Sequence, residues 1–277
     1  MKKSLLFLLG AGLLAGGGYY VYETDQEIHD KVDSFFSEKT ESDTIYLTDD
    51  SARKIKSYGE KRIDDPQKSP SKSTGPFAAL DKYARETPVS KESSFATLAN
   101  YLVIPAQTEE EKARLIFTWV ATHIRYDDES YNSGNYADMS AQNVLKRHKG
   151  VCEGYANVFK TLCDSAGLKA VKISGYAKGY GYKPGDKFTK TDHAWNAVSI
   201  NGKWCLMDAT WASISSQSIN GKLVSKLKFD DFWFKTEPQA FIFTHLPENV
   251  AWQLIPKKVI KLSEHENMPY LTDTHFR

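Results

Sequence analysis

Between Phe77 and Gly167, hydrophobic residues recur at the three- and four-residue spacing that is typical of amphipathic helices. Two short stretches that begin near Phe77 and Phe95 show this spacing first. A longer helix is predicted after Thr108-Glu-Glu-Glu111, because Thr followed three residues later by Glu is a capping box. Its buried face is predicted to consist of Ala113, Ile116, Phe117, Val120, Ala121 and Ile124.

Two more helices are predicted on either side of Gly150. Residues 140–147 have the pattern of a short helix, and Gly150 interrupts the chain just after it. Apolar positions have helical spacing again from Cys152 onward, and Gly167 is suited to end that helix. Cys152 is therefore expected at or near a helix N-terminus.

Beyond Gly167 the pattern changes from helices to strands. A strand is predicted over residues 169–174, followed by a connection rich in Gly, Tyr and Lys that runs through Asp186. The sequence Asn201-Gly202 between alternating runs is the strongest short signal for a β-hairpin. The segment 229–254 is aromatic and is predicted to be mixed in structure.

The N-terminus has the pattern of an export segment. Lys2 and Lys3 precede an uncharged, mostly apolar run over residues 4–22. A cleaved signal peptide would end near residues 15–18, whereas a retained anchor would use the whole run, since about 18 to 20 apolar residues span a bilayer. Both alternatives place the rest of the chain outside the cytoplasm, either secreted or anchored at the cell surface.

Three segments are predicted along the chain. Residues 1–22 form the signal peptide or membrane anchor, and residues 23–75 form a polar stalk with a possible short helix over 27–37. Residues 76–277 form the folded domain, with a core over about 95–256.

Composition excludes several classes of function. The formal net charge is +1, so no overall field attracts nucleic acid. There is no Cys-x-x-Cys or His-x-x-x-His pair, no Gly-x-Ser-x-Gly, no phosphate loop and no acidic calcium loop, so we expect neither a metal nor a cofactor. The 13% of aromatic residues would suit a groove for peptide or sugar, but aromatics are also ordinary core residues.

The candidate chemistry lies in three residues, which follow one another in the order Cys152, His193 and Asp208. A thiol, an imidazole and a carboxylate supply a nucleophile, a base and a group that orients the base, which is sufficient for acyl transfer through a thioester. The helix dipole would favour a thiolate at Cys152, and its small neighbours would let a substrate approach.

The hairpin predicts how His193 and Asp208 meet. With a two-residue turn at Asn201-Gly202, Ile200 faces Lys203, Trp195 faces Asp208, and His193 faces Thr210. His193 and Asp208 are then diagonal neighbours, about 7 to 8 Å apart at the backbone.

The remaining cysteines and histidines are poorer candidates. The same register turns Cys205 to the opposite face, and helix spacing makes Cys163 a core residue. An odd number of cysteines in an exported chain leaves at least one thiol free unless it pairs between chains. His148 is expected in a solvent-exposed basic turn, and comparable context is absent around His29, His123, His245, His265 and His275.

Several motifs in this order resemble the transglutaminase-like superfamily, in particular its microbial and kyphoscoliosis-peptidase-type branch. They are residues 113–120 with 124–127, Gly150-Val-Cys-Glu-Gly-Tyr-Ala156, Asp192-His-Ala-Trp-Asn196, residues 202–204 with 208–211, and a tail of the form Phe-x-x-x-His-x-Pro followed by Trp-Gln-Leu. The resemblance implies an α+β, papain-like fold with a helical N-terminal part packed on an antiparallel sheet. It also implies Cys152 as nucleophile, His193 as base and Asp208 as orienter.

The resemblance leaves the oxyanion donor and the reaction open. Animal transglutaminases use an upstream tryptophan, but no Trp lies between Trp119 and Cys152, where Tyr126 or Tyr131 could substitute. The backbone amide of Cys152 is the expected donor. We expect a thiol enzyme that acts on glutamine-containing or peptide substrates and transfers the acyl group to an amine or to water. The alternative is a catalytically idle envelope module that binds peptide, glycan or protein in the same groove.

Overall fold

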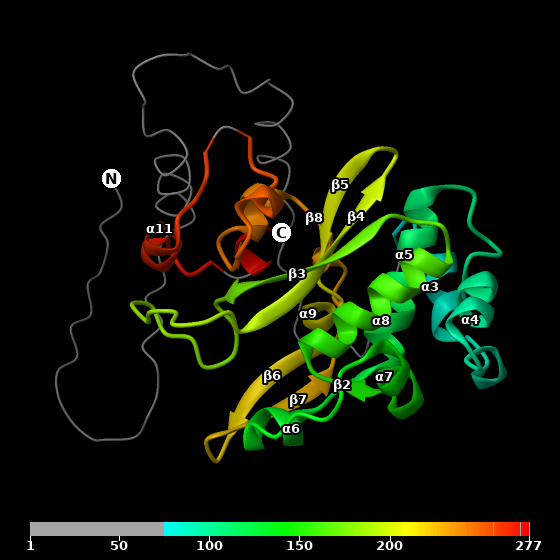
Figure 1. The fold of residues 1–277 in the computed structure, drawn as a ribbon, viewed down its shortest axis with the longest axis horizontal. Coiled ribbons are helices and arrows are strands. Elements are labelled where there is room, and N and C mark those ends of the chain that lie inside the picture. The colour runs from blue at the N-terminus through cyan, green and yellow to red at the C-terminus, as the bar shows by residue number, and fades with distance from the viewer. Residues whose placement is uncertain (1–74, 257, 272, 277) are drawn as a thin grey trace, which may run out of the picture. The chain divides into compact units, whose positions relative to one another are not determined.

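The computed structural model describes residues 75–256, 258–271 and 273–276. The five helices predicted in the first half from hydrophobic spacing are present (Figure 1), and two short helical elements, η1 and α6, were not predicted. The capping box of α5 is formed, because the Glu111 amide donates to Thr108 Oγ1 and the Thr108 amide to Glu111 Oε2, each over 3.1 Å. The helical elements of this half are α3 (Ala78–Arg85), η1 (Val89–Lys91), α4 (Phe95–Leu102), α5 (Glu109–His123), α6 (Asp128–Ser133), α7 (Ala141–Arg147) and α8 (Cys152–Ser165).

A buried ion pair joins α3 to α5. Arg114 donates from Nε and from a terminal guanidinium nitrogen to the two carboxylate oxygens of Asp81, each over 2.7 Å, and the Thr118 hydroxyl donates to the same carboxylate. The charges are thus matched by short hydrogen bonds, as burial of an ion pair requires.

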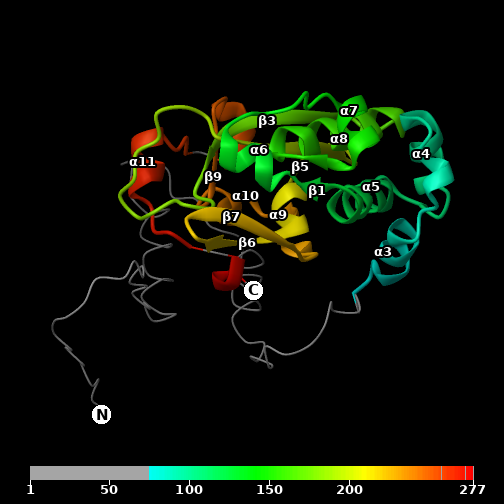
Figure 2. The ribbon, with the colours of Figure 1, turned by 90° about the horizontal axis from the view of Figure 1, so that it is seen from below.

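The second half supplies a five-stranded antiparallel sheet in the order β8-β5-β4-β3-β9. Helix α8 packs against β3 and β4 (Figures 1 and 2). The core between helices and sheet includes Phe117, Trp119, Phe159 and Trp195. The strands are β3 (Ala170–Ala177), β4 (His193–Ile200), β5 (Lys203–Met207), β8 (Phe234–Thr236) and β9 (His245–Pro247). The predicted α+β class, with a helical N-terminal part on an antiparallel sheet, is confirmed.

The predicted hairpin turn is confirmed, but the residue pairs predicted farthest from the turn, Trp195 with Asp208 and His193 with Thr210, are wrong. Ile200 pairs with Lys203, and Asn201 and Gly202 have positive φ of 51° and 78°. Pairing stops at Asn196 and Met207, because the chain leaves the sheet at Asp208. The Asp208 carboxylate caps α9 (Ala209–Ser213), so that Thr210 lies in a helix rather than opposite His193.

A second hairpin, which was not predicted, is formed by β6 (Ile214–Ile219) and β7 (Lys222–Leu227). Its turn is again Asn-Gly, with Asn220 and Gly221 at positive φ, so the signal was available in the sequence. Helix α6 fixes the hairpin, because Asn132 exchanges two hydrogen bonds of 2.8 Å with the backbone of Leu223.

Short elements complete the described chain. A two-stranded parallel pair, β1 (Arg125–Tyr126) and β2 (Lys149–Gly150), precedes α8. The others are η2 (Asp231–Trp233), α10 (Pro238–Phe241), η3 (Val250–Gln253), α11 (Leu262–Asn267) and η4 (Asp273–His275). The segment 229–254 is therefore mixed, as predicted.

The predicted export segment over 1–22, the stalk and its helix over 27–37 lie outside the described residues, which begin at Gly75. Within the described part of the chain, no helix combines the length and the apolar character needed to cross a bilayer.

Gly175 is the point of closest approach between β3 and its two neighbours. It pairs with His193 of β4 and with Pro247 of β9. A β-carbon at this position would overlap the Leu246 carbonyl oxygen and the Trp195 ring, and would lie 2.9 Å from the Pro247 Cα. The absence of a side chain therefore allows β9 to join the sheet beside His193.

Gly175→Ala is expected to destabilise the domain by roughly 1 to 3 kcal/mol or more, because the backbone carbonyl it meets cannot move without disturbing the β3–β9 pairing. Chemical denaturation measures the change. Gly75→Ala is the control, since an added β-carbon there meets nothing within 4 Å. Equal stability of the two variants would contradict the role assigned to Gly175.

Candidate active site

Cys152 is the first residue of α8, as the sequence predicts, and is half-buried. The β1–β2 pair fixes the chain that leads into it, because Tyr126 pairs with Gly150 and the Asp127 amide donates to the Gly150 carbonyl over 3.0 Å. Helix α8 extends over 14 residues, so its first-turn amides and its dipole face the thiol.

Gly154, two residues after Cys152, has a different role from the substrate access that the sequence analysis predicts for the small neighbours of Cys152. A β-carbon on Gly154 would lie 2.8 Å from a methyl group of Val144 and 3.2 Å from the Met139 sulfur. Gly154 thus allows α7 to pack closely against α8 instead of leaving room for a substrate.

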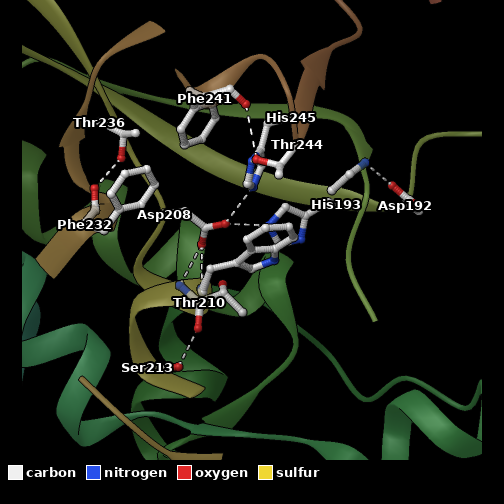
Figure 3. A network of polar contacts seen from close by, with 12 residues as sticks. Asp192, His193, Asp208, Thr210, Ser213, Phe232, Thr236, Phe241, Thr244 and His245 are labelled. Carbon is white, nitrogen blue, oxygen red and sulfur yellow. Dashed lines mark hydrogen bonds and ion pairs between the residues drawn. The ribbon is translucent and has the colours of Figure 1, made fainter. Parts of the chain in front are cut away.

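His193 begins β4, and its side chain is only 8% exposed. Its Nε2 lies 2.7 Å from Asp208 Oδ2 (Figure 3). Because an ionised carboxylate only accepts hydrogen bonds, Nε2 is the donor in this contact. The other ring nitrogen, Nδ1, is left for the Cys152 thiol, which also forms a hydrogen bond with His193.

Asp208 is fully buried, and its carboxylate accepts four hydrogen bonds. Oδ2 accepts from His193 and, over 3.1 Å, from Nε2 of His245. Oδ1 accepts from the backbone amides of Thr210 (2.8 Å) and Trp211 (3.0 Å) at the start of α9. Although His193 and Asp208 do not have the predicted strand register, the structure still brings them into direct contact.

The electrostatics of the site favour a charged His193 and an ionised Asp208. Burial alone would lower the pKa of His193, but the Asp208 carboxylate and the Cys152 thiol, with their hydrogen bonds, raise it to about 10. Burial alone would raise the pKa of Asp208, but His193 and the hydrogen bonds from both histidines hold it well below its usual range.

The other two thiols lie outside this arrangement, and all three cysteines are free. Cys163 is fully buried in α8, where burial raises its pKa well above the ordinary value, so its prediction as a core residue is confirmed. Cys205 is half-buried on β5, and burial also raises its pKa.

Two tyrosines, Tyr126 and Tyr131, lie near enough to Cys152 for its charge to act on them. Burial raises the pKa of Tyr126, and the neighbouring Cys152 raises it further. The Tyr126 ring lies 6.4 Å from that of Tyr155, one turn along α8 from Cys152, and 6.1 Å from that of Tyr131. Tyr131 in turn makes an edge contact with Tyr180 at 6.0 Å. Tyr126 is the tyrosine on which the charge of Cys152 acts most directly.

Sequence reasoning missed His245, which lies in the site. The signal that could have found it is the Phe241-x-x-x-His245-x-Pro247 part of the tail motif. His148, by contrast, is 39% exposed at its side chain, and its Nε2 forms a 2.7 Å hydrogen bond with a carboxylate oxygen of Glu92.

Within the described residues, His193, Asp208 and His245 are the one group of three whose possible metal-binding atoms lie within 4.8 Å of one another. Both histidines contact the carboxylate oxygen directly, at 2.7 and 3.1 Å. Both distances are typical of hydrogen bonds, so these three side chains form a hydrogen-bond network.

Asp208→Asn is expected to lower the pKa of the His193 imidazolium from about 10, since the largest favourable charge beside the ring is lost. NMR titration of the ring measures this pKa. The linked effect on stability has a defined sign. Because the pKa is raised above an unfolded value of about 6.5, the stabilisation is complete below about pH 6.5 and is lost as the pH rises through about 10.

Glu92→Gln is the matched control for this titration, because it removes a carboxylate that contacts His148 rather than His193. The control should leave the His193 titration unchanged. A His193 pKa that is the same in wild type and Asp208→Asn would contradict the assignment.

Comparison with known proteins identifies the family of the chain. Residues 96–209 match the family model described as the transglutaminase-like superfamily. Human kyphoscoliosis peptidase is 36% identical over 195 residues, which are 70% of this chain and 29% of that protein. Hillarin of Drosophila melanogaster is 32% identical over 217 residues, covering 73% of this chain and 25% of hillarin.

The chain thus spans less than a third of the length of these relatives. A solved structure described as a TGase aligns with 68% of this chain and 43% of its own, at 20% identity and a TM-score of 0.35. Taken together, the matched residues and the curated relatives show that this chain belongs to the transglutaminase-like superfamily.

Proposed function

We propose that this protein is an exported thiol enzyme that forms a Cys152 thioester with glutamine-containing or peptide substrates. The observation that carries the proposal is the 2.7 Å hydrogen bond between His193 and the buried Asp208, with the other side of the His193 ring next to a cysteine at a helix N-terminus. The transglutaminase-like fold supports a cysteine enzyme at the level of the superfamily.

In the first half-reaction, the Cys152 thiolate attacks the carbonyl carbon of a side-chain or peptide amide. The carbon–sulfur bond forms, and the negative charge moves to the carbonyl oxygen. The first-turn amides of α8, including that of Cys152, have no acceptor within the helix and are the proposed oxyanion donors. When the intermediate collapses, the leaving ammonia or amine takes a proton from the His193 imidazolium.

In the second half-reaction, an amine or a water attacks the thioester and gives a proton to His193. The carbon–sulfur bond then breaks, and the Cys152 thiolate and the His193 imidazolium are restored. Asp208 holds the ring throughout and itself remains ionised. An amine gives a cross-linked product, whereas water gives hydrolysis. One relative is named a peptidase, so hydrolysis has to be measured beside amine transfer.

The proposed reaction is tested by two assays run in parallel, the incorporation of a fluorescent amine into a glutamine-containing protein and the cleavage of peptides. Cys152→Ala is expected to lower the active signal by a factor of roughly 1,000 or more, since it removes the nucleophile. Cys205→Ala is the matched control, because it removes a half-buried thiol outside the site and should keep the activity. If Cys152→Ala leaves both signals unchanged, the proposal is wrong.

A thiol-reactive probe separates an enzyme from a module that only binds. Selective labelling of Cys152 in the folded protein near neutral pH is expected for an accessible nucleophile beside the His193 ring. Labelling of Cys152 only after denaturation would instead favour a catalytically idle module that binds peptide, glycan or protein in the same groove.

Export is also part of the proposal, with the domain secreted or held at the cell surface. Support comes from Lys2 and Lys3 before the apolar run over 4–22. N-terminal sequencing of mature protein distinguishes cleavage near residues 15–18 from a retained anchor. In intact cells, added protease should digest an anchored domain, and protection until lysis would contradict this location.

A further inference from the structure

His245 places a second imidazole on the carboxylate oxygen that His193 uses. It lies on β9, far from His193 in sequence, and its Nε2 is 3.1 Å from Asp208 Oδ2 (Figure 3). The side chain is fully buried, as is that of Asp208. The proposed reaction described above assigns no role to this ring.

The hydrogen-bond partners fix the proton on His245. An ionised carboxylate only accepts, so Nε2 of His245 must donate to it. The other nitrogen, Nδ1, lies 2.8 Å from the Thr244 hydroxyl, which also lies 3.3 Å from the Phe241 carbonyl oxygen. The single hydroxyl proton can go to Nδ1, the nearer of the two acceptors. A neutral ring with its proton on Nε2 satisfies both contacts. Burial lowers the pKa of His245 to about 4, which agrees with a neutral ring at neutral pH.

Aromatic side chains hold the His245 ring in place. Phe241 stacks on it, with ring centroids 4.1 Å apart and an angle of 25° between the planes. The rings of Trp211, Trp195 and Trp233 surround it at 4.3, 5.1 and 5.4 Å. Backbone pairing with Ala177 fixes the strand that carries it. Rotation of the His245 ring would therefore require the surrounding aromatic side chains to rearrange.

The orientation of His245 has a consequence for the carboxylate. The two backbone amides of α9 already hold Oδ1, and His245 approaches Oδ2 from the side of β9. The remaining acceptor direction of Oδ2 is the one that His193 uses. The carboxylate cannot rotate away from His193 without losing one of these three other donors.

We propose that His245 is a positioning residue, which directs Asp208 Oδ2 at His193 and thereby holds the free nitrogen of His193 toward Cys152. This inference rests on the proposed thiol chemistry of Cys152. If position 245 only filled space among these aromatic rings, a side chain without polar atoms would suffice. Burying an imidazole is costly unless its nitrogens are hydrogen-bonded, so the contact with Asp208 accounts for a histidine here.

The first experiment compares His245→Phe with His245→Gln in the full chain. Phenylalanine keeps an aromatic ring against Phe241 but has no donor, whereas the glutamine amide can still donate to Asp208. His245→Phe is expected to lower kcat roughly tenfold with little change in KM, since a hydrogen bond to a charged group is lost. His245→Gln should recover most of this loss.

His265→Phe is the control, because it also replaces a fully buried histidine but one that makes no contact with Asp208. It should keep kcat. Thermal unfolding of all three variants checks that each is folded at the assay temperature. The proposal is overturned if folded His245→Phe keeps the wild-type kcat, or if folded His245→Gln loses as much as His245→Phe.

A second measurement does not depend on turnover. NMR of the ring N–H protons should show deshielded Nε2–H signals from both His193 and His245 in the wild type. In His245→Phe the remaining His193 signal should shift and broaden, and in His265→Phe it should not change. If the wild type shows no turnover in either assay, the proposed enzyme function is wrong. The role of His245 is then tested by the NMR signal alone, and an unchanged His193 Nε2–H signal in His245→Phe overturns the positioning role.

Discussion

The buried carboxylate of Asp208 is the charge around which the site is arranged. A carboxylate without solvent is stable only when its oxygens accept hydrogen bonds, and Asp208 accepts four of them. The donors come from β4, from the start of α9 and from β9, and in the sheet β4 and β9 lie on either side of β3. The need to satisfy one negative charge thus fixes the end of a hairpin, the start of a helix and the position of a distant strand.

This requirement extends the site beyond the part of the chain that the family model covers. The match ends at residue 209, one residue after Asp208, yet the second imidazole on the carboxylate is supplied by His245. Strand β9 reaches this place only because Gly175 has no side chain where the Leu246 carbonyl passes. The segment after α9 is therefore part of the architecture of the site, although it contains neither the thiol nor the base.

Local signals in the sequence predicted the elements whose causes are local. The capping box of α5, the start of α8 at Cys152 and the Asn201-Gly202 turn each depend on a few neighbouring residues. The outer hairpin pairs were predicted wrongly because aspartate at 208 is also a good helix cap, and capping prevailed over strand extension. His245 was missed because it lies on a three-residue strand, which carries no periodicity, and because its partner is 37 residues away.

The two histidines show why one carboxylate can serve two purposes. Both donate to the same oxygen, yet the pKa of His193 is raised to about 10 and that of His245 is lowered to about 4. His193 has the Cys152 thiol on its other side, so a positive charge on this ring has two partners. Apart from Asp208, the contacts of the His245 ring among the described residues are with aromatic rings and the Thr244 hydroxyl, so its charged form is desolvated without a second anion there. Since two cations beside one carboxylate would repel each other, a neutral His245 leaves the positive charge on the ring that faces the thiol.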